Sequence, residues 1–323
     1  MILPPVRTVD YHTAGEPFRI VVGAPVTVRG ATVAERRMFA IDDPAVDGLR
    51  RLLCFEPRGH ADMYGCFVTP PDDAGAHFGA LFWHKDGFST ACGHGTIALG
   101  VWALRSGLVP ADPSGTTDVI IDVPSGRVTA RVHADHVDFV NVPSYVLVSD
   151  VPVAGTSATL AFGGAIYACV EAATLGLAVT RDRLPELISV GREIKWALDP
   201  AARHPSDARL DGVYGTILFD DLGDLHRRNV TIFADGEVDR SPCGSGTCAQ
   251  VATLAATGRL RPGQELLCDS IVGTRFTARV LADVVSDGRP AVVPQVSGMA
   301  YSIGESVFTV DPDDPLVPGF VLR

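Results

Sequence analysis

The pentapeptide CGHGT at residues 92–96 returns 151 residues later as CGSGT at residues 243–247. Each copy is a glycine-rich turn that leads into an apolar stretch with helical spacing. The first stretch stops at Gly107 and the second at Gly258. This repeat predicts two similar halves of about 150 residues, related by duplication, each with its cysteine at the start of a helix.

The rest of the chain alternates short β-branched runs with Gly, Pro and Asp turns, which indicates a strand-rich α+β protein. A hairpin is predicted for residues 119–132, where two alternating runs flank Pro124-Ser125-Gly126. Strands are also predicted at residues 137–142 and 276–280, and helices at residues 95–105, 183–197 and 247–257.

Composition narrows the class of protein. The chain has 323 residues and a formal net charge of −11, which disfavours binding to nucleic acid or to anionic membranes. Residues 1–7 lack the pattern of a signal peptide, and no apolar run is long enough to cross a membrane. We therefore expect a cytoplasmic protein whose seven cysteines are free thiols.

The repeated turn has a chemistry of its own. Unpaired N–H groups and the helix dipole favour an anion at a helix N-terminus, and they are expected to lower the pKa of a cysteine placed there. Two such turns facing one cleft would supply two acid/base thiols and donors for a carboxylate. These groups could remove the α-proton from one face of the Cα of an amino acid and deliver a proton to the opposite face.

Other sites have less support. No C-x₂-C or H-x₃₋₅-H pair is present, so no metal is expected. Neither turn completes a nucleotide-binding fingerprint, and no lysine lies in a context typical of a pyridoxal site, so no cofactor is expected. A lone cysteine at a helix start is more often structural, but its repetition with the glycines favours catalysis. The remaining cysteines are expected to be small buried residues.

The sequences DRSPCGSGT at residues 239–247 and CGHG at residues 92–95 resemble, respectively, the second and the first signature of the family of proline racemases and hydroxyproline 2-epimerases. The other segments are DYHTAGEP at 10–17, GHADMYG at 59–65, YGT at 214–216 and VSG at 296–298. The resemblance therefore spans nearly the whole chain.

This resemblance implies a diaminopimelate-epimerase-like fold, with two pseudo-symmetric α/β domains that each wrap a mixed sheet around a central helix. The expected domains are residues 1–155 and 156–304, with about 305–323 returning to the first. Cys92 and Cys243 would be the acid/base pair, and the substrate-binding residues would be Gly93, His94, Asp239, Gly244, Ser245, Tyr64 and Phe233. A homodimer is common in such relatives.

The activity is predicted to be cofactor-independent inversion at Cα of proline or hydroxyproline. The alternative is a trans-3-hydroxy-L-proline dehydratase, which residues 59–64, 89–90 and 314–320 resemble. Such dehydratases typically carry threonine at the position of Cys243. A threonine hydroxyl is too weak an acid or base to reprotonate the second face, so Cys243 favours inversion. A binding protein without turnover is a third hypothesis.

Overall fold

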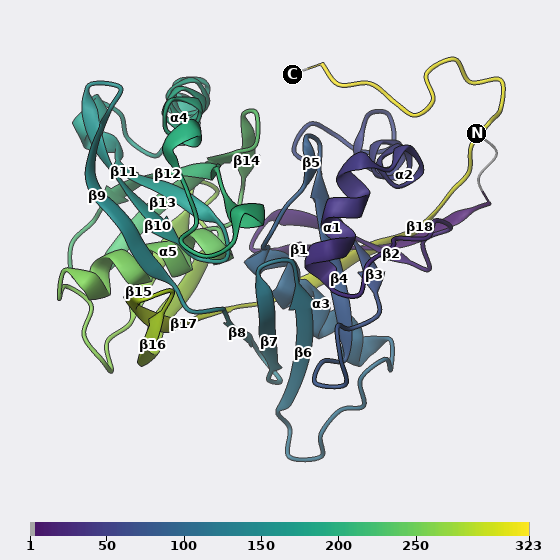
Figure 1. Cartoon of the computed structure of the whole chain (residues 1–323), viewed down its shortest axis with the longest axis horizontal. Coiled ribbons are helices and arrows are strands. Elements are labelled where there is room, and N and C mark those ends of the chain that lie inside the picture. The colour runs from purple at the N-terminus through teal and green to yellow at the C-terminus, as the bar shows by residue number, and fades with distance from the viewer. Residues whose placement is uncertain (1–3, 323) are drawn as a thin grey trace.

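The chain folds into two halves, and in each half strands surround one buried helix (Figure 1). The computed structural model describes residues 4–322. The first half contains β1 (Val6–Thr13), β2 (Glu16–Val22), α1 (Val33–Asp42), α2 (Pro44–Cys54), β3 (Gly65–Thr69), β4 (Phe78–His84), β5 (Gly87–Phe88), α3 (Gly93–Arg105), β6 (Thr117–Val123), β7 (Gly126–Val132) and β8 (Val137–Val140). The second contains β9 (Tyr145–Val153), β10 (Thr156–Phe162), β11 (Ile166–Glu171), α4 (Leu184–Leu198), β12 (Val213–Asp221), β13 (His226–Phe233), β14 (Glu237–Asp239), α5 (Gly244–Ala256), β15 (Leu266–Ser270), β16 (Arg275–Ser286) and β17 (Arg289–Gly298).

The two central helices are α3 and α5. In α3 every residue from Gly93 to Ala103 is buried, and in α5 nearly all residues are. A helix that is apolar all round must be covered on every side. The sheet supplies this cover, because α3 packs against β1, β2, β7 and β8, and α5 against β9, β10, β16 and β17.

The outer helices cover the remaining faces of the sheets. Helix α4 packs against β12 and β13 in the second half, while α1 and α2 pack against β4 in the first. These two helices of the first half were not predicted, although the sequence carries their start signals. Thr32 and Glu35 form a capping box before α1, and Asp43 caps α2 with Pro44 at its first turn.

The predicted hairpin is confirmed, since β6 and β7 pair in antiparallel register across residues 117–132. The three predicted helices correspond to α3, α4 and α5, with bounds within three residues of those expected. The predicted strand at residues 137–142 is shorter, as β8, and the one at residues 276–280 extends into the longer β16.

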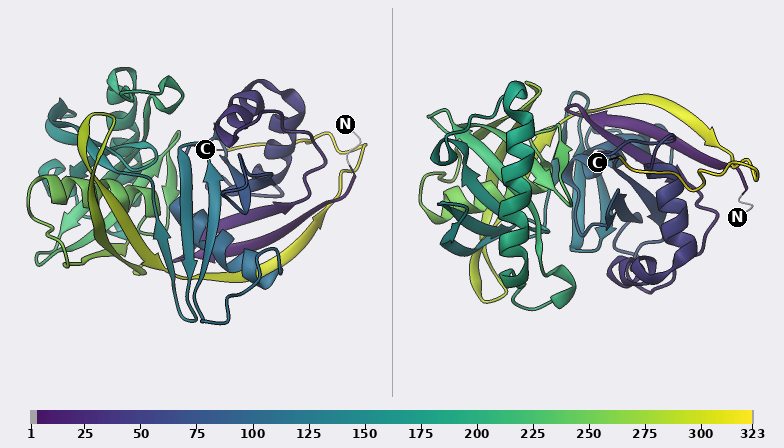
Figure 2. Two further views of the ribbon diagram at one scale, coloured as in Figure 1. Left: turned by 60° about the horizontal axis from the view of Figure 1, so that its bottom comes forward. Right: turned by 90° about the horizontal axis from the view of Figure 1, so that it is seen from above.

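Two long-range pairings join the halves. Strand β17 pairs with β8, and β18 (Ala300–Phe308) then crosses to the first half and pairs with β1 along its whole length. Figure 2 shows this last strand beside the first one. Strand β9 pairs with β10, so the domain boundary expected after residue 155 lies inside a hairpin of the second half. The C-terminal segment that returns to the first half includes β18, which begins at Ala300.

None of the helices in residues 4–322 is long and apolar enough to span a membrane. Of the seven-residue N-terminal stretch considered above, residues 1–3 lie outside the described part of the chain.

Candidate active site between the halves

The N-termini of α3 and α5 meet head to head. A Cβ atom added to Gly93 would lie 2.6 Å from the Cα of Gly244, and one added to Gly244 would lie 2.6 Å from the Cα of Gly93. Such distances are far shorter than any normal contact, so only glycine fits at both positions. The glycines of the two repeat copies thus allow two helix N-termini, with their unpaired N–H groups, to meet.

Each cysteine of the repeat caps its own helix. The N–H of Gly95 donates to the Sγ of Cys92 at 3.2 Å, and the N–H of Gly246 donates to the Sγ of Cys243 at 3.3 Å. Cys243 has a φ of +63°, a left-handed conformation that is costly for any residue other than glycine. The hydroxyl of Ser241 accepts the N–H of Cys243 at 3.0 Å and helps to hold it.

Both sulfurs line the same small cavity. Its wall includes all nine residues predicted from the sequence, namely Tyr64, Cys92, Gly93, His94, Phe233, Asp239, Cys243, Gly244 and Ser245. The cavity holds only about 20 Å³, roughly enough for one water molecule. The site is therefore closed around its thiols, and an amino acid can enter only if the surrounding side chains or the two halves move apart.

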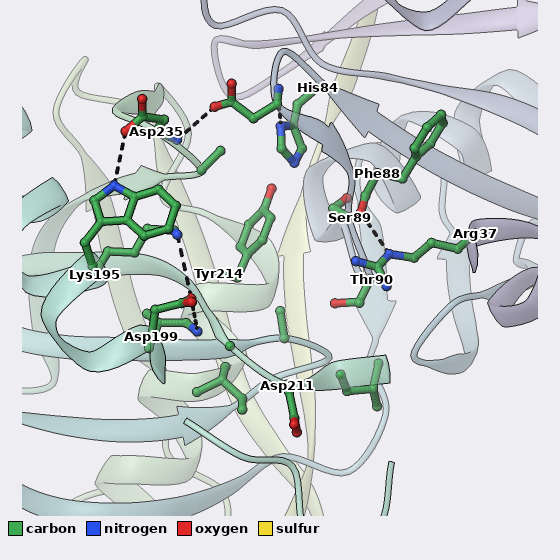
Figure 3. A pocket seen from close by; sticks show the side chains of 18 residues that line it. Arg37, His84, Phe88, Ser89, Thr90, Lys195, Asp199, Asp211, Tyr214 and Asp235 are labelled. Atoms are coloured by element: carbon green, nitrogen blue, oxygen red, sulfur yellow. Dashed lines mark hydrogen bonds and ion pairs between the residues drawn. The ribbon is translucent and has the colours of Figure 1, made fainter. Parts of the chain in front are cut away.

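A larger cleft lies next to this cavity. It measures about 420 Å³, and Figure 3 shows Arg37, His84 and Ser89 of the first half facing Lys195 and Asp235 of the second across it. Tyr214 lines both the cleft and the thiol cavity. The Tyr214 side chain therefore lies between the cleft and the thiol cavity.

Three hydroxyl groups separate the cleft from the thiols. The hydroxyl of Tyr64 hydrogen-bonds to that of Tyr214 at 3.0 Å and also to the hydroxyl of Ser89. The first of these bonds joins the two halves. Phe233 stacks on Tyr214 with ring centroids 5.6 Å apart and lies 5.8 Å from Tyr64, so aromatic rings form this wall of the cavity.

We expect Tyr214→Phe to loosen this closure while leaving the aromatic wall in place. Loss of one hydrogen bond should cost about 0.5–1.5 kcal/mol of unfolding free energy, and alkylation of the thiols by iodoacetamide should become several-fold faster. Denaturant titration and timed mass spectrometry would measure the two effects. Unchanged alkylation would mean that Tyr214 does not control access.

His94 and Asp239 occupy the polar side of the cavity. Both ring nitrogens of His94 lie 3.5 Å from the Sγ of Cys92, and Nδ1 lies 3.9 Å from a carboxylate oxygen of Asp239. Burial lowers the pKa of His94, and Asp239 only partly opposes this effect. The imidazole is therefore neutral at neutral pH. The other oxygen of Asp239 accepts from the N–H and hydroxyl of Ser241 at 2.8 and 2.7 Å.

The thiol pKa values run opposite to the sequence expectation. Burial raises the pKa of both Cys92 and Cys243 well above the ordinary value, and the negative charge of Asp239 raises both further. The N–H groups of Gly95 and Gly246 lower the two pKa values, but by less than burial raises them. The expectation of a depressed pKa was wrong because the sequence shows the helix N-terminus but not the extent of burial.

This reversal predicts a pH dependence. Because the raised pKa keeps both sulfurs protonated at neutral pH, alkylation of Cys92 and Cys243 without substrate should be slow at pH 7. The rate should climb through the alkaline range as thiolate forms. Rates measured by mass spectrometry between pH 6 and 10 would test this. A rate that is already at its plateau at pH 7 would contradict it.

Ionic contacts from the first half hold the loop before Cys243. Asp62 accepts from the guanidinium of Arg240 at 2.8 Å and from the N–H of Val238 at 3.0 Å. Glu16 accepts the N–H of Arg240 at 2.7 Å. Glu16 and Asp62 therefore hold the loop that precedes Cys243 against the first half.

Four further residues of the cavity wall were not predicted as site residues, namely Ala91, Tyr167, Tyr214 and Thr231. Tyr214 belongs to a segment that resembled the family, so a signal existed. Tyr167 lies with its hydroxyl 4.0 Å from the Sγ of Cys243. It sits on β11, a strand that is buried throughout apart from its last residue, where an inward-facing tyrosine looks like any core residue.

Within residues 4–322, two groups of side chains could share a metal ion, and neither includes a thiol. One consists of His84, Asp86 and Glu237, and the other of His133, His136 and Asp138. In the first group, Nδ1 of His84 already accepts the N–H of Asp86 at 3.2 Å, and Lys85 lies 3.2 Å from the Asp86 carboxylate. That group is therefore poorly suited to a cation.

Comparison with known proteins identifies the relatives of this chain. Its sequence is 42% identical to a trans-3-hydroxy-L-proline dehydratase of Bacillus cereus, over 98% of this chain and 97% of that protein. It is also 42% identical to a 3-hydroxyproline 2-epimerase of Burkholderia multivorans, over 98% of each chain. Enzymes of both kinds, isomerases and dehydratases, thus share this sequence pattern.

The fold agrees with these matches. A hydroxyproline epimerase from Agrobacterium vitis, crystallised with trans-4-hydroxy-L-proline, superposes with a TM-score of 0.91 at 30% identity, over 98% of this chain and 96% of that one. The expected diaminopimelate-epimerase-like fold is confirmed. The proline racemase family profile matches residues 8–321. The chain therefore belongs to the proline racemase family.

Proposed function

We propose that this protein inverts the configuration at Cα of proline or a hydroxyproline, with Cys92 and Cys243 as the acid/base pair and without a cofactor. The observation that carries the proposal is the cavity shared by two thiols, each capping a helix whose N-terminus meets the other. A reaction that uses both faces of one carbon needs two such groups.

The substrate carboxylate is proposed to lie at the joined helix N-termini. The N–H groups of Gly93, His94, Gly244 and Ser245 precede the first intrahelical bonds and have no partner within their helices. The hydroxyl of Ser245 is buried and makes no hydrogen bond in the described structure. These donors would stabilise the charge that moves onto the carboxylate when Cα loses its proton.

The ring nitrogen of the substrate would face Asp239, whose buried carboxylate would compensate its positive charge. One sulfur, as thiolate, takes the α-proton while the opposite thiol gives up its own to the other face of Cα. One S–H bond forms and one breaks, so the pair ends with the same number of protons. The raised thiol pKa values make each sulfur a strong base once it is deprotonated.

Dehydration of trans-3-hydroxy-L-proline is the second candidate, and one observation favours it. The hydroxyls of Tyr64, Ser89 and Tyr214 form a connected group at one wall of the site. If one thiolate removes the α-proton, the electron pair forms a Cα–C3 double bond and expels the 3-hydroxyl, which takes a proton from such a donor and leaves as water. The resulting enamine tautomerises to a pyrroline.

One experiment separates these activities. The reduced protein would be incubated in D₂O with L-proline, trans-4-hydroxy-L-proline and trans-3-hydroxy-L-proline, each followed by proton NMR and polarimetry. Loss of the α-proton signal together with epimer formation supports inversion and names the substrate. A pyrroline from the 3-hydroxy compound, with no epimer from any substrate, would replace inversion by dehydration.

A further inference from the structure

We propose that Cys243 exchanges its proton with solvent through water molecules held by a polar row between β13 and α5, formed by Thr231, Asn229, Arg227 and Gln250. This role of Cys243 rests on the proposed function, in which one inversion leaves each thiol in the protonation state that the other had before. The next molecule of the same enantiomer therefore needs a proton removed from one sulfur and supplied to the other. Because the thiol cavity holds only about 20 Å³, this exchange needs a route.

Three members of the row alternate along one face of β13. Thr231 lines the thiol cavity, and Nη1 of Arg227 donates to Oε1 of Gln250 on α5 at 3.1 Å. Both side chains thus point to the side of the sheet that α5 covers. Since side chains alternate along a strand, Asn229, two residues from each, points to the same side. Ile232 points to the opposite side, against α4.

The middle of the row has buried polar atoms without protein partners. Within residues 4–322, neither Nδ2 nor Oδ1 of Asn229 makes a hydrogen bond, and Nε2 of Gln250 makes none. Both side chains are fully buried. Buried polar atoms of native proteins are nearly always hydrogen-bonded, and ordered water is the partner where no protein group is in reach. These atoms therefore indicate a place for water along the row.

The spacing of the row suits single water molecules. Side chains two residues apart on a strand leave the backbone roughly 6.5–7 Å apart. A water that bonds to one group on each side, at about 2.8 Å from each, spans most of that distance. One water between Thr231 and Asn229, and another between Asn229 and Arg227, would make the row continuous.

The inner end of the row reaches the thiol. Burial and the charge of Asp239 raise the pKa of Cys243, and the hydroxyl of Thr231 opposes this by hydrogen bonding that favours the thiolate. Thr231 is thus the member of the row that can place a water beside the sulfur.

The outer end is a buried cation. The guanidinium of Arg227 stacks over the ring of Phe219 at 4.0 Å. Its cross-strand neighbour Asp221 is bound instead to Arg259 at 2.7 Å, and the Arg259 side chain is half exposed. A buried guanidinium whose neighbouring carboxylate is engaged elsewhere needs water to complete its hydrogen bonds. The Asp221–Arg259 pair marks the place where the row meets solvent.

The first half has the equivalent strand without polar side chains. Strand β4 precedes the Cys92 turn as β13 precedes the Cys243 turn. Each strand pairs with an antiparallel strand before it, a short antiparallel strand after it, and a parallel strand beyond the central helix. Counted back from the last residue of each strand, the row positions of β13 correspond in β4 to Phe82, Ala80 and Phe78.

The helix position of the row is apolar in the first half as well. Leu99 lies seven residues after Cys92, as Gln250 does after Cys243. Leu99 and the three residues of β4 belong to the apolar core around α3. The fold itself therefore does not require polar side chains at these positions.

Cys92 has another group that can exchange protons. Both ring nitrogens of His94 lie 3.5 Å from its sulfur, and an imidazole can shuttle protons. The second repeat has Ser245 at the position of His94, and a hydroxyl cannot do this near neutral pH. The polar row thus serves the thiol whose own turn lacks an imidazole.

Each transfer along the row conserves protons. The S–H bond of Cys243 breaks as an O–H bond forms on the first water, which passes one of its other protons to the next water. The last water releases a proton to solvent, and the sulfur is left as thiolate. The reverse sequence restores the thiol. The side chains of the row hold the waters in line, so they are positioning residues.

The test is hydrogen exchange of the thiols in D₂O, followed by the infrared S–H bands of the reduced full-length protein without substrate. The Cys243 band is the one missing from Cys243→Ser, and the Cys92 band is the one missing from Cys92→Ser. Asn229→Leu keeps the size of the side chain without its polar atoms, so the Cys243 band should decay several-fold more slowly. The Cys92 band should be unchanged. Asn229→Ser, which retains a hydroxyl, should restore part of the rate.

Thr216→Val is the matched control. Thr216 is also fully buried, on the neighbouring strand β12, but its hydroxyl donates to the carbonyl of Gly191 on α4 at 2.9 Å. Both thiol bands should decay in this variant as in the unmodified protein. A merely structural role of Asn229 would hasten exchange of both thiols in Asn229→Leu, because a loosened core admits solvent, and that result would overturn the proposal.

Equal decay of the Cys243 band in Asn229→Leu and in the unmodified protein would also overturn it. So would a slowing by Tyr167→Phe alone, since the hydroxyl of Tyr167 is the other one near this sulfur, at 4.0 Å. If Asn229→Leu does not fold, a high-resolution crystal structure of the unmodified protein decides. Ordered waters bonded to Asn229 and Gln250 support the row, and their absence refutes it.

Kinetics separate this proposal from the proposed function. Thiol exchange needs no substrate, so a protein that inverted no proline isomer would refute the function and leave the exchange result standing. With an inverted substrate, Asn229→Leu should keep the rate of the first turnover and lose several-fold in the steady-state rate, because only return of the free enzyme is slowed. A slower first turnover with unchanged thiol exchange would count against the row.

Discussion

Cys243→Ser is expected to lower the rate of inversion at Cα about 10³-fold, within the range that a positioned acid or base contributes. A serine hydroxyl keeps nearly the same size and can still accept the N–H of Gly246, so the loop should stay folded. Its pKa is far too high for it to exchange a proton with carbon near neutral pH. The loss should therefore lie in kcat, with KM little changed.

Deuterium exchange makes this prediction sharper. With Cys243 removed, Cys92 can still take the α-proton of the one enantiomer that presents it to this sulfur, so exchange should persist for that enantiomer and stop for the other. Cys92→Ser should show the opposite preference.

Cys248→Ala is the control, because this cysteine is buried on α5 outside the cavity wall. The activity of this variant should stay near that of the unmodified protein. Inversion by Cys243→Ser at a near-normal rate would end the two-thiol mechanism.

Gly93→Ala should be the next most damaging change. The added methyl would lie 2.6 Å from the Cα of Gly244 and 2.8 Å from the ring of Phe139, so the helix N-termini would have to separate. Overpacking of this kind costs about 1–3 kcal/mol of unfolding free energy. A displacement of about 1 Å between reacting groups can lower the rate about 10²-fold.

Activity and thermal stability should be measured on the same preparations. Gly304→Ala on β18 is a suitable control, since nothing lies within 4 Å of its added Cβ and its φ is not left-handed. That variant should keep both properties. Full activity in Gly93→Ala would show that the meeting of the two helices is not required for catalysis.

The repeat in the sequence located the central helices and the cysteines well, because a glycine turn followed by an apolar helix is a local pattern. Helices α1 and α2 were not predicted although their caps are visible in the sequence, because residues 33–54 contain no part of the repeat. Their apolar residues belong to a separate core between these helices and β4, and nothing in the repeat points to it.

Other features of the site depend on distance in space rather than in sequence. The contact between Gly93 and Gly244 joins residues from different halves, and only the folded chain shows that it excludes any side chain. The closure by Tyr64, Ser89 and Tyr214 likewise combines three separate segments. Burial explains the direction of the thiol pKa, and burial of a glycine-rich turn cannot be judged from the turn itself.

The pairing of β18 with β1 has a consequence for how the protein is made. Strand β1 begins at Val6, yet its partner β18 ends at Phe308, so the half that leaves the ribosome first lacks one of its strands until residues 300–308 have been synthesised. The strands and helices of the second half, up to Gly298 on β17, have by then all been synthesised. A chain cut just after Gly298 would thus keep every strand and helix of the second half, but in the first half β1 would lack its partner β18. The half that is translated first is the last to be completed.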